Sequence, residues 1–111
     1  MRVPLMPNKK QTVWVVMHYE FTGVEPGEYI DAVQFHVASS RRSAEKYIRG
    51  RWVYPFSWWQ VHPHVLDYDG CEREGKEVYY YSHKGTPLAR PPYKRAQKAW
   101  ERDKIKNPHL H

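Results

Sequence analysis

The chain has 111 residues, a length that forms one domain with one modest core. Aromatic residues make up 15% of it, which argues against a disordered chain because disordered segments are poor in aromatics. The single cysteine, Cys71, excludes an internal disulfide and a zinc site built from several cysteines. There is no apolar run of membrane-spanning length and no leader pattern, so we expect a cytoplasmic protein without membrane contact.

The first third of the chain predicts two strands joined by a hairpin connection. After a flexible lead-in over residues 1–11, alternating side chains predict a strand over residues 13–21 and a second over residues 29–38. We expect one apolar face to hold Val13, Val15, Met17, Tyr19 and Phe21 of the first strand and Val33, Phe35 and Val37 of the second.

A helix is predicted over residues 41–49. Ser39 and Ser40 can cap its start, because a serine oxygen accepts from the free N–H groups of the first turn. Apolar residues recur at three-and-four spacing, and Gly50 lies where the helix would end. The pattern of Ser39, Ser40 and Ala44-Glu45-Lys46-Tyr47-Ile48 after a strand resembles small uncharacterised bacterial and phage strand-strand-helix-strand domains. Those domains have no known activity that the resemblance could transfer to this chain.

The second half of the chain predicts two more strands and a second helix. Residues 58–66 form the third strand, in which Pro63 indicates an edge strand or a bulge. Three consecutive tyrosines lie in a fourth strand over residues 78–83. The prolines of residues 84–92 predict an extended linker, and a basic helix and tail follow over residues 93–111.

This order of elements predicts an α+β domain. We expect residues 12–83 to form a four-stranded antiparallel sheet (β-β-α-β-β) with one helix packed on a face and a basic C-terminal helix outside it. The residues expected to be buried are Val15, Phe35, Val37, Ala44, Tyr47, Ile48, Trp59 and Val61.

The sheet face away from the first helix is the first candidate site. If Val13, Phe35 and Trp59 point at the helix, the opposite face carries flat aromatics among hydrogen-bonding groups, which suits base stacking. Its candidate residues are Trp14, Trp58, His62 and His64. Two alternatives stay open: the final helix covers this face through Tyr93, Ala96 and Trp100, or the face forms a dimer contact.

The basic C-terminal segment is the second candidate site. Residues 1–83 hold 10 basic and 10 acidic side chains, and residues 84–111 hold 8 and 2, so the net charge of +6 lies in the tail. Regular spacing along the final helix would let its cations follow a phosphate backbone. The candidates are Arg90, Lys94, Arg95, Lys98, Arg102 and Lys104. The alternative is a solvated helix whose lysines pair with Glu101 and Asp103.

No catalytic pattern is present in the sequence. It has no glycine-rich phosphate loop, nucleophile elbow or His-Glu-x-x-His motif, and His62 with His64 falls short of a zinc ligand set. We therefore expect a non-enzymatic binding module with no metal or other cofactor. Its expected partner is nucleic acid, a nucleoprotein or an acidic protein. The alternative is an adaptor or homodimer that uses the aromatic face as its interface.

Overall fold

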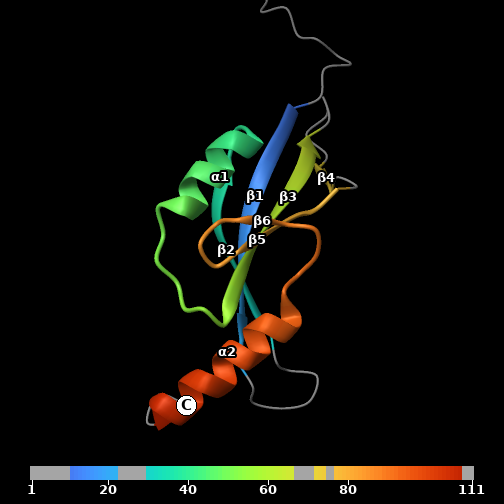
Figure 1. The fold of residues 1–111 in the computed structure, drawn as a ribbon. Helices are drawn as coiled ribbons and strands as arrows, with labels where there is room; N and C mark the ends of the chain where they lie inside the picture. Colours follow the sequence, from blue (N-terminus) through green and yellow to red (C-terminus); the bar gives the residue numbers. More distant parts are fainter. Residues whose placement is uncertain (1–10, 23–29, 67–71, 75–76, 109–111) are drawn as a thin grey trace, which may run out of the picture.

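The structure is a computed structural model that describes residues 11–22, 30–66, 72–74 and 77–108. Its elements, in chain order, are β1 (Gln11–Phe21), β2 (Ile30–Ala38), α1 (Arg41–Arg49), β3 (Ser57–Leu66), β4 (Glu72–Glu74), β5 (Tyr79–Ser82), β6 (Pro87–Leu88) and α2 (Tyr93–Lys106). The strands form one antiparallel sheet in the order β2-β1-β3-β5-β6, and β4 also pairs with β3. α1 lies along the sheet, and α2 lies near the end where β3 begins (Figure 1).

The predicted α+β fold is confirmed, with two short strands added. β4 and β6 have three and two residues, and β6 lies inside the segment predicted to be a linker. α1 has the predicted bounds, and α2 begins at the predicted residue, Tyr93. The predicted lead-in lies outside the described residues except for Gln11, which is the first residue of β1.

The start of α1 follows from its cap. The Ser40 side-chain oxygen accepts from the backbone N–H of Ser43 at 3.0 Å, which satisfies one of the free donors of the first turn. Ala44 and Ile48, one turn apart, are fully buried. These two residues face the sheet in a core that consists of Val16, Ala38, Ala44, Ile48, Trp59, Val61 and Tyr81.

The turn between β5 and β6 packs against the end of α1. Gly85 in this turn has a φ of 90°, a region that favours glycine. A Cβ at Gly85 would lie 3.2 Å from Ile48 Cγ2 and 3.0 Å from Arg49 Cγ. The absence of a side chain therefore lets residues 83–86 approach the C-terminal end of α1.

We expect Ile48→Ala to lower the free energy of unfolding by about 2–5 kcal/mol, because it leaves a cavity between α1 and the sheet. Urea denaturation measures this loss, and Arg42→Ala, at an exposed position of the same helix, is the control. A loss near zero for Ile48→Ala would show that α1 does not pack as described.

The two faces of β1 are the reverse of the prediction. Val16 lies opposite Val61 and His18 opposite Trp59, and directly opposed residues of an antiparallel pair share a face. Val16, Val61 and Trp59 belong to the core under α1, so the other set of β1 side chains faces away from α1. That set contains Val15, which is buried as predicted but on the second face. The prediction was wrong because both sets place an apolar, buried side chain at the middle of β1, Val15 on one face and Val16 on the other, so alternation alone does not tell which face the helix covers.

The edge position of β2 exposes two residues that were predicted to be buried. Phe35 and Val37 are 45% and 46% exposed, because β2 has a neighbouring strand on only one side. Tyr47, also predicted to be buried, is half-buried. Among the residues expected in the core, the prediction is confirmed for Val15, Ala44, Ile48, Trp59 and Val61.

A bulge in β2 further separates Val37 from Phe35. The register shifts at Phe35, because its neighbours Gln34 and His36 lie opposite consecutive residues of β1. Beyond this shift Val37 lies opposite Val15, on the face away from α1. Phe35 contacts the aromatic rings of the α1 face, so the predicted common face of the two residues is wrong.

Pro63 lies in a central strand, so the predicted edge strand is wrong, and the ladder on the outer side of β3 is interrupted at this position. β5 pairs with residues 58–61 of β3, and β4 pairs with residues 64–66. Pro63 falls between these two paired segments, where no β4 or β5 residue is registered opposite it. The missing N–H of proline is therefore accommodated inside the sheet.

Candidate nucleic-acid interface

The predicted aromatic and histidine site is divided between the two faces of the sheet. Trp14 is half-buried on the α1 face, where its ring centroid lies 5.9 Å from that of Tyr79. Trp58 lies on the other face, and His62 and His64 follow it along β3. These four predicted site residues therefore do not form one surface.

Trp58 is fully buried at the α2 end of the sheet, so its ring is not open to a base. Tyr93 meets this ring edge-on, with centroids 5.2 Å apart. Trp100 meets Phe21 in the same manner at 5.8 Å, and Ala96 between them is buried. The alternative prediction, in which Tyr93, Ala96 and Trp100 of the final helix cover this face, is confirmed at this end of the sheet.

A hydrogen-bonded chain fixes the polar side chains of β3. Trp58 Nε1 donates to Gln60 Oε1 at 3.0 Å, and Gln60 Nε2 donates to His62 Nε2 at 3.1 Å. His62 Nε2 is then an acceptor, which places the ring hydrogen on Nδ1. Within the described part of the chain, no three His, Cys, Asp or Glu side chains gather as a metal-binding group. The expectation that the protein uses no metal stays a prediction.

The basic residues predicted in the C-terminal segment are all exposed. α2 carries Lys94, Arg95, Lys98, Arg102 and Lys104, and Arg90 lies just before it. Both acidic side chains of α2 accept a hydrogen bond from an amide side chain: Gln97 donates to Glu101 at 3.5 Å, and Asn107 donates to Asp103 at 3.2 Å. The helix therefore presents a basic outer surface while its other side packs on the sheet.

A second basic surface, which was not predicted, lies between the segment after α1 and the turn between β5 and β6. We call it the Trp52 pocket; its volume is about 310 Å³, and it is lined by Arg49, Arg51, Trp52, Val53, Pro55, His83 and Lys84. This lining includes three cationic side chains and no carboxylate. Its field therefore favours an anion.

Trp52 gives this pocket an open aromatic wall. Its side chain is 78% exposed, in contrast to the buried Trp58. The Trp52 ring meets Tyr54 at 5.0 Å, and Tyr54 stacks on the buried Phe56 at 4.9 Å. These ring contacts link Trp52 through Tyr54 to the buried Phe56, and most of the Trp52 side chain stays accessible for stacking.

His83 connects the Trp52 pocket to α2 electrostatically. Burial lowers the pKa of His83, and the positive charges of Lys84 and Arg95 lower it further. Arg95 belongs to the first turn of α2, so a cation of that helix contributes to this lowering of the His83 pKa. The imidazole is therefore mainly neutral at pH 7, and the charge of the pocket comes from its arginines and lysine.

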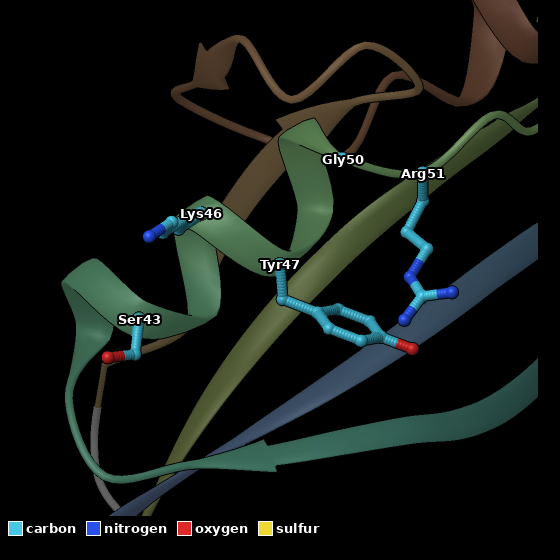
Figure 2. Close-up of a pocket in the computed structure, with 5 residues that line it drawn as sticks. All are labelled: Ser43, Lys46, Tyr47, Gly50 and Arg51. Carbon is cyan, nitrogen blue, oxygen red and sulfur yellow. The ribbon is translucent and has the colours of Figure 1, made fainter.

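Arg51 also lines a second hollow, which we call the Tyr47 pocket. It measures about 390 Å³ and is lined by Ser43, Lys46, Tyr47, Gly50 and Arg51. Figure 2 shows the Arg51 side chain reaching back to the Tyr47 ring, while Lys46 points away from it. The guanidinium carbon lies 4.1 Å from the ring centroid, and His36 of β2 stacks on the same ring at 4.1 Å. This stack holds the Arg51 guanidinium over the Tyr47 ring.

The charge of the segment around α1 explains why these hollows are basic. Residues 41–51 contain five Lys or Arg and one Glu, a net charge of +4. The single carboxylate, Glu45, accepts a hydrogen bond from the Tyr81 hydroxyl at 2.7 Å, and burial raises the pKa of Tyr81. Residues 1–83 as a whole hold equal numbers of basic and acidic side chains, so their net charge of zero does not reveal this local excess of positive charge. The run Arg49-Gly50-Arg51-Trp52 is nevertheless visible in the sequence.

Fold and surface together define a small α+β domain with two exposed basic surfaces. No family model, curated protein or solved structure matches the chain. The resemblance predicted for residues 39–48 stays a prediction. In the described residues, no helix is both long and apolar enough to cross a membrane.

Proposed function

We propose that this protein is a non-enzymatic module that binds single-stranded nucleic acid. The observation that carries the proposal is the Trp52 pocket, in which an exposed aromatic ring adjoins three cations and no carboxylate. Single-strand binders combine these two features, since bases stack on aromatic rings and cations neutralise the adjoining phosphates. A base on Trp52 would leave its phosphate within the field of Arg49, Arg51 and Lys84.

The basic surface of α2 supports the same proposal. Lys94, Lys98 and Arg102 are exposed and spaced four residues apart, so they follow one side of the helix. Cations in such a row attract a phosphate backbone without selecting a sequence. In this proposal the Trp52 pocket holds one nucleotide, and α2 contacts the backbone beyond it.

Replacing Trp52 by alanine should weaken binding to a single-stranded oligonucleotide by about 1–3 kcal/mol, the range found for loss of one base–aromatic stack. Fluorescence anisotropy of a labelled oligonucleotide measures this change at constant low salt. The dependence of affinity on salt should stay nearly the same, because stacking releases few counterions.

Trp52→Phe is the matched control, because it keeps a flat ring at the same position. We expect this variant to retain most of the affinity that Trp52→Ala loses. Equal binding by the wild type and by Trp52→Ala would exclude Trp52 as the stacking residue. Equal losses in both variants would show that stacking on a flat ring alone does not account for the contribution of Trp52.

A further inference from the structure

The geometry points to the outer edge of β2 as a homodimer interface, at which two copies join their sheets in antiparallel fashion around a two-fold axis near Gln34. β2 is the end strand of the sheet, and within the described residues no strand pairs with its outer side. An open strand edge carries unpaired N–H and C=O groups that another strand can satisfy. This inference is independent of nucleic-acid binding.

The side chains of this edge are unusual for a strand exposed to water. Residues 32–38 contain no Lys, Arg, Asp, Glu, Pro or Gly. Val33, Phe35 and Val37 are 45–46% exposed. Proteins normally protect a long edge strand with charges or proline, and β2 has one charged residue, Asp31 near its start, and no proline. Its bulge at Phe35 is the one protective device of this kind seen in residues 32–38.

The sequence of β2 is complementary to itself in antiparallel orientation. An axis at Gln34 sets the two Gln34 residues opposite each other, and each Val33 opposite Phe35 of the second copy. Val33 lies opposite His18 in β1, and His18 contacts Phe35, so both apolar side chains belong to the α1 face. Aromatic and β-branched residues are favourable cross-strand pairs.

The lack of charge on residues 32–38 favours a second copy over a charged partner at this edge. The chain has a net charge of +6, with local excess on residues 41–51 and on α2. An acidic partner would be drawn to those basic surfaces, whereas residues 32–38 are an uncharged strip on which two like-charged chains can approach. The symmetric pair would carry α1 of both copies on the same face of one continuous sheet.

The test is the native mass of the full chain by light scattering or sedimentation, over a dilution series. We expect a species of twice the 13.4 kDa chain mass that dissociates on dilution. Val33→Lys should weaken the association at least about tenfold, because each copy would bring a lysine into the uncharged seam. Ala32→Lys, at a second exposed position of β2, should act in the same direction.

Ile105→Lys is the control, since Ile105 is 81% exposed on α2 and should leave the association unchanged. A monomer at every concentration overturns the inference, including the case in which the monomer binds a different protein. A dimer that both β2 variants leave intact also overturns it. Gln34→Cys in a Cys71→Ser background should form a disulfide-linked dimer, and Gln97→Cys on α2 should not. Failure of Gln34→Cys to cross-link would contradict pairing around Gln34.

Discussion

Replacing Trp58 by alanine is expected to lower the free energy of unfolding by about 3–5 kcal/mol. The Trp58 ring is fully buried, stacks on Tyr19 with centroids 5.6 Å apart and meets Tyr93 of α2 edge-on. Alanine would leave a cavity between α2 and the sheet. It would also remove the indole N–H of Trp58, which donates a hydrogen bond to the buried Gln60 Oε1.

Urea denaturation of Trp58→Ala and Trp52→Ala provides a direct comparison of the two tryptophans. Trp52 is 78% exposed, so its removal should change the free energy of unfolding by only about 0.5 kcal/mol or less. The pair thus separates a structural tryptophan from a surface one. Similar losses in the two variants would contradict the assignment of Trp58 to the core and of Trp52 to the binding surface.

The second large effect is the change in the salt dependence of binding when the cations of the Trp52 pocket are removed. Changing Arg49, Arg51 and Lys84 together to glutamine should flatten the plot of log affinity against log salt by up to about two units for a single strand, at about 0.7 per contacted phosphate. Each cation that contacts a phosphate releases a counterion on binding, and the glutamine variants release none. Anisotropy titrations at several salt concentrations measure the slope.

Two further variants control for position and for charge. Arg49→Lys with Arg51→Lys keeps the charge of the Trp52 pocket, and its slope should equal that of the wild type. A variant with glutamine in place of Lys94, Lys98 and Arg102 loses the same amount of charge from α2, and its slope should be lower by a similar amount. If only the α2 variant lowers the slope, the strand does not contact the Trp52 pocket.

The helices were predictable because their signals are local. The caps at Ser40 and Gly50 and the spacing of Ala44 and Ile48 define α1 without reference to the rest of the chain. The alternation within each strand was equally clear. It did not reveal which side of β1 faces α1, because Val15 and Val16 are both apolar and both buried.

The candidate site was less predictable because its parts come from distant segments. Only the turn at Gly85 brings His83 and Lys84 to the residues that follow α1. The sequence also does not distinguish Trp52 from Trp58, since Trp58 is buried where Tyr93 of α2 packs on it and Trp52 is not. The basic residues of α2 were predicted from spacing alone, because one helix carries all but Arg90.

Titration of a labelled single-stranded oligonucleotide with the wild-type protein, across a range of salt concentrations, tests whether the protein binds single-stranded nucleic acid. We expect binding at low salt that weakens linearly on logarithmic axes as salt increases. We also expect quenching of tryptophan fluorescence in the wild type that is reduced in Trp52→Phe, because Trp52 is the most exposed of the described tryptophans. No binding at the lowest salt, or an affinity that salt leaves unchanged, would contradict single-strand binding.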